Sequence, residues 1–180
     1  MRTALRYDTR NDYTNSTQGL LEEFLLEYSI GAGGDFNGGR LSYQHRHFRP
    51  LADGLVLAHR ASADLTLGDM RFFELLQLGG SSTVRGLPQA RVRGQGRFLL
   101  NGELRWQGLQ LSGRQHIFLG ALLFVDLGHI YARQDSPSLD HWRRSAGAGL
   151  RFHWHGTILR ADYGKSDGRT GIYITLRQLF

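Results

Sequence analysis

Apolar and polar side chains alternate at every second position through most of this chain, and this period constrains the fold more than any other feature. It is clearest in residues 146–155, where alanine, leucine, phenylalanine and tryptophan alternate with glycine, arginine and histidine. Successive side chains of a β-strand point to opposite faces, so the pattern predicts strands with one apolar and one polar face. About nine such segments lie between Gly-, Asn- and Asp-rich breaks: 3–9, 18–30, 38–48, 54–66, 96–107, 115–131, 144–155, 156–164 and 171–180.

The length of these segments favours a membrane barrel over a soluble sheet. Segments of about 9 to 12 residues match the tilted span of a bilayer, whereas strands of soluble sheets have about 5 or 6. Aromatic residues fall near several predicted strand ends, as an interfacial girdle requires: Phe48, Trp106, Tyr131, Trp154 and Phe180. Alternation by itself also fits a soluble β-sandwich or small barrel whose apolar face points inward, and that alternative stays open.

Composition removes several other classes of protein. No apolar run approaches the roughly 18 to 20 residues of a membrane-spanning helix, because even Ile117–Val125 is ended by Asp126. The net charge is +6, but the basic residues are scattered singly and form no basic run, so no nucleic-acid partner is expected. The chain has no Cys, which excludes disulfides and thiolate metal sites. Its first residues lack the apolar core of a signal peptide.

One long segment, residues 67–95, interrupts the alternation and contains the most specific motif, Gly79-Gly80-Ser81-Ser82-Thr83-Val84-Arg85-Gly86-Leu87. We predict no strand there, and connections of this length in compact proteins are usually functional or disordered. Further motifs follow in order. They are Asn101-Gly102-Glu103-Leu104-Arg105, Phe124-Val125-Asp126-Leu127-Gly128 and Gly147-Ala148-Gly149-Leu150-Arg151-Phe152, then Leu159-Arg160-Ala161-Asp162-Tyr163-Gly164 and a final Phe180.

This ordered set resembles the BamA/TamA superfamily of outer-membrane barrels, also called the bacterial surface antigen family. Arg6-Tyr7-Asp8-Thr9-Arg10 ahead of Gly19 is similar to a turn of the family, so the resemblance covers essentially the whole chain. It implies an all-β fold: an antiparallel transmembrane β-barrel portion, about nine strands of a sixteen-strand barrel. The motif at 79–87 would be its sixth extracellular loop, folded into the lumen. Residues 1–180 would then be the C-terminal part of the barrel domain, with the lumen loop at 67–95.

The strand count carries a further expectation. In the family this loop lies between the eleventh and twelfth strands, and five predicted strands follow it here. Only about four precede it, so about seven strands and any periplasmic POTRA domains are expected to lie upstream. A nine-stranded sheet with lipid-exposed edges would leave backbone groups unsatisfied, so we expect a fragment or one partner in an oligomer.

Arg85 is the expected anchor of the loop, because a loop that folds into the lumen must satisfy its polar groups within the protein. Its guanidinium offers five donors in a fixed fork. Strand parity points both Asp126 and Glu103 into the lumen, and we expect Asp126 to be its first partner and Glu103 its second. Gly79, Gly80 and Gly86 permit turns and close approach. In the alternative interpretation Arg85 is exposed and Asp126 pairs with Arg151.

The motif set also departs from the family. Leu87 stands where an aromatic residue usually follows Arg-Gly, which weakens packing of the loop tip beside Val84. The terminal strand keeps the final aromatic of the assembly signal, whose candidate residues are Gly171, Tyr173, Leu176 and Phe180. Arg177 replaces a residue that is commonly small. Other inward charges are expected to form a solvated ladder: Arg60, Asp64, Arg160, Asp162 and Arg177.

We expect no enzyme chemistry, metal or cofactor. His45 with His47, and His153 with His155, would share a strand face, but neither pair has an evident third ligand. The resemblance implies residence in the bacterial outer membrane, with lipid, client outer-membrane proteins or upstream periplasmic domains as partners. Members insert or translocate other proteins. The alternative is the barrel part of a patatin-like phospholipase whose catalytic domain is absent here.

Overall fold

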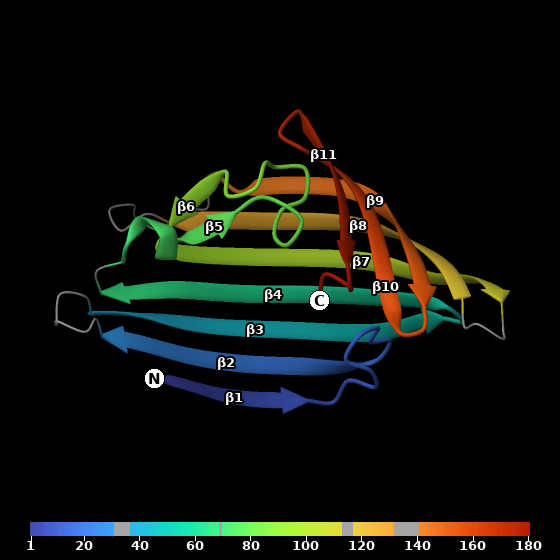
Figure 1. The fold of residues 1–180 in the computed structure, drawn as a ribbon, viewed down its shortest axis with the longest axis horizontal. Helices are drawn as coiled ribbons and strands as arrows, with labels where there is room; N and C mark the ends of the chain where they lie inside the picture. Colours follow the sequence, from blue (N-terminus) through green and yellow to red (C-terminus); the bar gives the residue numbers. More distant parts are fainter. Residues whose placement is uncertain (31–36, 69, 113–116, 132–140) are drawn as a thin grey trace.

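The computed structural model describes residues 1–30, 37–68, 70–112, 117–131 and 141–180, and these form one nine-stranded antiparallel sheet. The strands follow the chain in the order β1-β2-β3-β4-β7-β8-β9-β10-β11 (Figure 1). Their bounds are β1 Arg2–Asp8, β2 Gly19–Ile30, β3 Asn37–Ala52, β4 Leu55–Gly68, β7 Gly96–Ser112, β8 Ile117–Tyr131, β9 Arg143–Trp154, β10 Thr157–Ser166 and β11 Arg169–Leu176.

The prediction of nine strands is confirmed, with four strands before the long loop and five after it. Residues 115 and 116 of the predicted strand 115–131 lie outside the described residues. The loop itself holds more structure than the sequence predicts. A short 3₁₀ helix, Phe72–Glu74, precedes a small hairpin of β5 (Leu76–Leu78) and β6 (Val92–Gly94).

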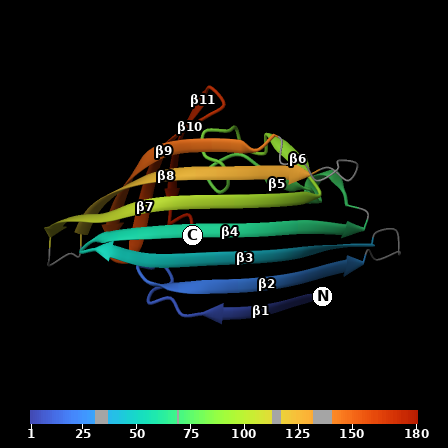
Figure 2. The ribbon, with the colours of Figure 1, turned by 180° about the vertical axis from the view of Figure 1, so that it is seen from behind.

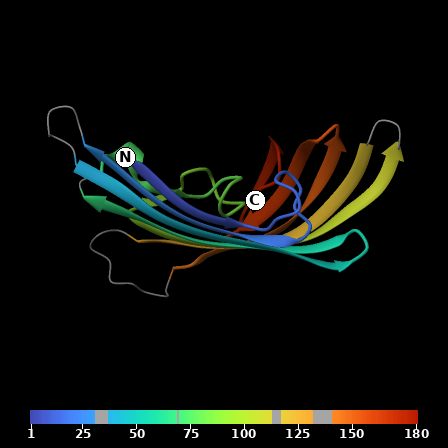
Figure 3. The same cartoon turned by 90° about the horizontal axis from the view of Figure 1, so that it is seen from below.

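The sheet bends into a trough, and residues of the long loop lie on its concave side (Figure 3). Figure 2 shows the sheet from the other side. Alternation follows this geometry: on β8 the concave-facing Leu122, Phe124 and Asp126 are buried, while Leu123 and Val125 are 62% and 58% exposed. We call these two surfaces the inner and the outer face.

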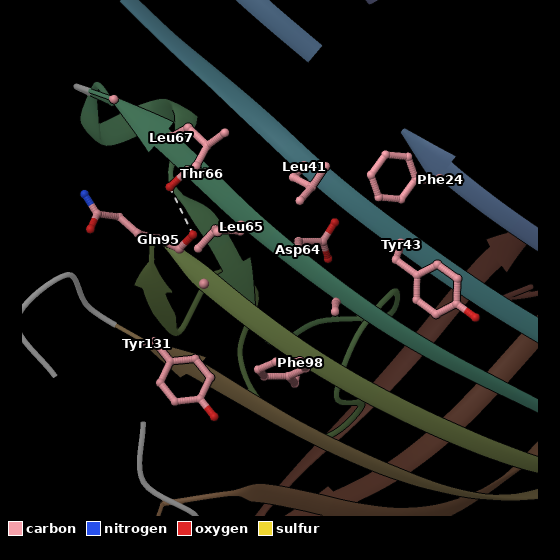
Figure 4. Close-up of a pocket in the computed structure, with 13 residues that line it drawn as sticks. Phe24, Leu41, Tyr43, Asp64, Leu65, Thr66, Leu67, Gln95, Phe98 and Tyr131 are labelled. Atoms are coloured by element: carbon pink, nitrogen blue, oxygen red, sulfur yellow. Dashed lines mark hydrogen bonds between the residues drawn. The ribbon is translucent and has the colours of Figure 1, made fainter. Parts of the chain in front are cut away.

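The outer face is apolar and grooved. One groove crosses from β2 to β8 and is lined by aromatic rings, among them Phe24, Tyr43, Phe98 and Tyr131 (Figure 4). Trp106 and Trp154 are also exposed. In the described residues no helix has the length and hydropathy that crossing a membrane requires.

The predicted end of the chain is wrong in one respect. The terminal strand, predicted to span 171–180, ends at Leu176, and Arg177 has a left-handed backbone with φ of +70°. Phe180 therefore turns to the inner face, where it packs with Phe48, Val56 and Ala58. Neither Phe48 nor Phe180 therefore belongs to an outer girdle, because both rings are buried in this inner apolar cluster.

Candidate functional site

The tip of the long loop rests on the inner face of the sheet, and Arg85 is its largest fully buried side chain, with none of its surface exposed. The tip is shaped by a tight turn in which the Gly79 amide donates to Thr83 Oγ1 over 2.8 Å. The Thr83 hydroxyl in turn donates to the Gly79 carbonyl over 3.0 Å. This turn leads directly into Val84 and Arg85.

Three carboxylates from three strands surround the Arg85 guanidinium. Asp126 on β8 accepts two bonds, from Nε to Oδ2 at 2.9 Å and from Nη2 to Oδ1 at 2.8 Å. Nη1 donates to Glu103 on β7 at 2.7 Å and to Asp162 on β10 at 3.2 Å. All four side chains are fully buried. The structure thus brings Arg85 together with both expected partners and with one further carboxylate.

Asp126 is the acceptor at the centre of this group. Besides the guanidinium it accepts from the Arg85 backbone amide at 3.1 Å, from Asn101 Nδ2 at 2.7 Å and from Ser145 Oγ at 3.1 Å. Burial lowers the pKa of the Arg85 guanidinium, but hydrogen bonding to Asp126 and the charges of Glu103 and Asp162 outweigh this and hold it above its ordinary value. The loop residue therefore stays charged and fixed.

A second layer of arginines neutralises the carboxylates from the other side. Arg105 donates to Glu103 at 2.8 Å, and Arg151 donates to Asp162 at 2.6 Å. The alternative pairing of Asp126 with Arg151 is thus not what the structure shows. Asp162, expected in a solvated ladder, is 1% exposed. Buried charges are stable only when they are paired and hydrogen-bonded, and this network supplies both.

The wall of the trough also holds the backbone of the loop. Arg160 donates to the carbonyl of Ser81 at 2.9 Å, and Arg60 donates to that of Ser82 at 2.8 Å. Asn101 Nδ2 donates to the next carbonyl, that of Thr83, at 2.9 Å. Three consecutive peptide oxygens are therefore satisfied by side chains of β10, β4 and β7, as a loop removed from water requires.

The end of the motif is packed against β10 without space for a larger residue. Gly86 has a φ of +96°, and a Cβ there would lie 2.8 Å from the Ser166 nitrogen. A Cβ on Gly164 would lie 2.9 Å from the Arg85 carbonyl carbon. Beside this contact Val84 and Leu87 are buried in an apolar cluster with Leu78 and Leu99. Leu87 fills this position, where the resemblance implies an aromatic residue.

The four terminal-strand candidates separate in space. Tyr173 reaches the loop, and its hydroxyl accepts from the Gly86 amide and donates to the Leu87 carbonyl, each over 3.0 Å. Gly171 lies beside Tyr173. Leu176 is 66% exposed on the outer face, and Phe180 lies in the inner apolar cluster.

Several further residues of this site were named from the sequence without being connected with the loop. Asp162 was expected to point inward as part of a solvated ladder, and the structure places it beside Arg85. Nothing local in the sequence indicates that Asn101 or Tyr173 meets the loop, because those contacts depend on where the loop tip rests. The same holds for the carbonyl contacts of Arg60 and Arg160.

The histidines form a separate group. On β3 and β4, His45 Nε2 lies 3.2 Å from His59 Nε2, and His45 Nδ1 lies 2.6 Å from Glu22 Oε1. His47 contacts the His59 ring edge-on. In the described part of the chain, no three His, Cys, Asp or Glu side chains are arranged to hold a metal ion.

Comparison with known proteins agrees with this fold. A family described as the Omp85 superfamily domain matches residues 1–174. The chain belongs to the Omp85 superfamily. This membership confirms the resemblance to the BamA/TamA group, and it makes the chain part of a β-barrel of the bacterial outer membrane. The outer face of the trough is accordingly its lipid-facing surface.

Two individual proteins illustrate the relationship. The outer membrane transporter CdiB of Dickeya dadantii (strain 3937) is 28% identical over 123 residues, which cover 67% of this chain and 21% of CdiB. The crystal structure of BamA from Haemophilus ducreyi, lacking POTRA domains 1–3, superposes with a TM-score of 0.78 at 16% identity. That match covers 98% of this chain and 40% of the BamA chain. The chain therefore spans only a minor part of either relative.

Proposed function

We propose that this chain is the C-terminal part of an outer-membrane barrel domain that inserts or translocates other proteins, with residues 67–95 as its inner loop. The observation that carries the proposal is the clamp on Arg85, in which carboxylates of β7, β8 and β10 hold one loop residue. Such a clamp fixes the loop against three strands of the wall. It gives the barrel a rigid inner brace next to its terminal hairpin.

The terminal hairpin is the part of the barrel suited to receive a client. Among the described residues β11 pairs with β10 alone, so its other edge presents backbone donors and acceptors. A client strand can add to such an edge through main-chain hydrogen bonds. In this mechanism β11, with Gly171, Tyr173 and Leu176, forms one side of the opening, and the segment ending at Phe180 folds away from it into the lumen.

The network is suited to binding and support rather than to catalysis. Each carboxylate of the Arg85 clamp is already occupied by guanidinium donors, so none is available as a general base for a substrate. The expected partners are outer-membrane lipid, client outer-membrane proteins and upstream periplasmic domains. Nothing in the fold or among the relatives favours a phospholipase.

A reconstitution assay tests the proposal. The full protein that carries this chain is incorporated into liposomes, and the folding rate of an unfolded client barrel is compared with the rate in protein-free liposomes. We expect faster folding with the protein, a reduced gain with Arg85→Ala and an unchanged gain with Arg143→Ala. Arg143 is a suitable control because its ion pair with Asp167 is solvent-exposed. Equal rates with and without the wild-type protein would reject an insertion function.

A further inference from the structure

Tyr173 joins the inner loop to the terminal strand through a single hydroxyl group. This oxygen accepts a hydrogen bond from the Gly86 amide and donates one to the Leu87 carbonyl, each 3.0 Å long. Both partners are backbone groups at the end of the loop motif. In the sequence, Tyr173 is separated from Gly86 by 87 positions and from Leu87 by 86 positions.

The local backbone makes room for this contact. A Cβ on Gly171 would lie only 2.5 Å from the Tyr173 hydroxyl oxygen, so a glycine two residues earlier on the same face lets the ring lie flat along the strand. Gly171 pairs in register with Gly164, which itself allows Arg85 to approach β10. The hairpin therefore carries two facing glycines where the loop docks.

Register places Tyr173 at the centre of the same network. Its direct partner across the hairpin is Asp162, and Asp162 binds the guanidinium of Arg85. Adjacent strands thus hold consecutive loop residues: β10 holds the side chain of Arg85, and β11 holds the backbone of Gly86 and Leu87. A shift of the loop moves the partners of both strands together.

Within the described residues Arg169–Leu176, few other contacts attach β11 to the interior. Its alternate residues Ile172, Ile174 and Leu176 are 66–74% exposed on the outer face. Of its inward residues, Thr175 has a buried hydroxyl without a hydrogen-bond partner in the described structure. Within Arg169–Leu176, the Tyr173 hydroxyl is therefore the principal polar link between this strand and the loop.

We infer that Tyr173 is a positioning residue that couples the inner loop to the terminal strand, so that release of the loop loosens β11 and displacement of β11 loosens the loop. The inference rests on the proposed function, in which β11 borders the opening for clients. Coupling of this kind needs a structural feature whose state depends on both the loop and β11. The two hydrogen bonds of the Tyr173 hydroxyl are such a feature, because they form only when the loop end and β11 lie together.

Hydrogen exchange of the full chain in detergent tests the coupling without any client. Tyr173→Phe keeps the ring and removes both hydrogen bonds. Loss of each bond should raise the equilibrium constant for local opening about fivefold. We expect amide exchange to rise about tenfold or more in both 169–176 and 79–87, and less in the strands that Tyr173 does not contact. The matched control is Tyr163→Phe, on β10, because Tyr163 is 51% exposed on the outer face.

A second comparison separates coupling from general loosening. Arg85→Ala should speed exchange of β11 in the wild-type background and add little in the Tyr173→Phe background, because the link is already broken. Gly171→Ala keeps the hydroxyl but displaces it, and should reproduce the exchange pattern of Tyr173→Phe.

Two results would overturn the inference. Unchanged β11 exchange in Tyr173→Phe would remove the link, and a uniform rise across all strands would make Tyr173 an ordinary structural residue. Neither result depends on client insertion, so a failure of the coupling through Tyr173 is distinguishable from a failure of the proposed function.

Discussion

The guanidinium carbon of Arg85 lies 3.4 Å from the centroid of the Phe124 ring. The edge of that ring lies against Gly147, where a Cβ would lie 2.4 Å from Phe124 Cζ and 2.8 Å from Cε1. The ring therefore contacts both the loop arginine and the backbone of β9. It adds a cation–π contact to the carboxylates that bind Arg85.

The first prediction concerns this ring. Phe124→Leu keeps an apolar side chain but removes the face on which the guanidinium rests, and a desolvated cation–π contact contributes about 2 kcal/mol. We expect the variant to unfold at a lower temperature and to release the loop to protease sooner. Phe152→Leu, on the outer face of β9, is the control. Equal loss in both variants would show that the stacking contributes nothing specific.

The second prediction concerns the clamp. Arg85→Ala leaves Asp126, Glu103 and Asp162 buried beside a cavity, and breaking a buried pair on one side costs about 3 to 5 kcal/mol. The barrel should lose heat resistance, and the loop should become sensitive to protease. Arg143→Ala breaks an exposed pair, which contributes about 0 to 1 kcal/mol. If Arg85→Ala melts like Arg143→Ala, the clamp is not a stabilising feature.

The third prediction separates backbone strain from steric exclusion at the loop tip. Gly86 and Gly156 both have positive φ angles, +96° and +78°, but only Gly86 has neighbours where a Cβ would go. Strain alone should cost about 1 to 3 kcal/mol in each alanine variant. Gly86→Ala must in addition lift the loop from β10. Protease cleavage within 79–87 should therefore rise only for Gly86→Ala, and equal cleavage in both variants would contradict tight docking.

The fourth prediction tests the position of the last residue. The chain has no Cys, so a spin label on a single introduced cysteine reports one site. Phe180→Cys should be shielded from lipid-soluble oxygen, whereas Ile174→Cys should be accessible to it. Oxygen accessibility as high at position 180 as at 174 would place Phe180 on the lipid face and contradict the inner cluster.

The strands could be predicted from the sequence because a period of two determines both the element and its face. The same parity argument directed Asp126 and Glu103 inward, where the structure has them. Phe180 could not be placed this way, because it shares the outward parity of Ile174 and Leu176, and only the turn at Arg177 directs it inward. Phe48 does share the inward parity of Arg46 and pairs with Ala58, but the girdle prediction rested on its place near a strand end.

The rest of the site depends on contacts between distant segments. Asp162 was assigned to a solvated ladder because parity gives a direction but not the depth of burial. Tyr173 and Asn101 contact the loop only because the loop tip docks at one particular position along the strands. Neither the hairpin of β5 and β6 nor this docking position follows from local residue preferences.

The contacts of Arg160 and Arg60 with the carbonyls of Ser81 and Ser82 have an evolutionary consequence. A peptide oxygen is present whatever residue carries it, so these bonds place no requirement on the side chains at positions 81 and 82. A substitution at position 81 or 82 therefore leaves the acceptor of each bond in place. The sequence requirement for these contacts therefore falls on Arg160 and Arg60 of the barrel wall, and not on the loop residues whose carbonyls they bind.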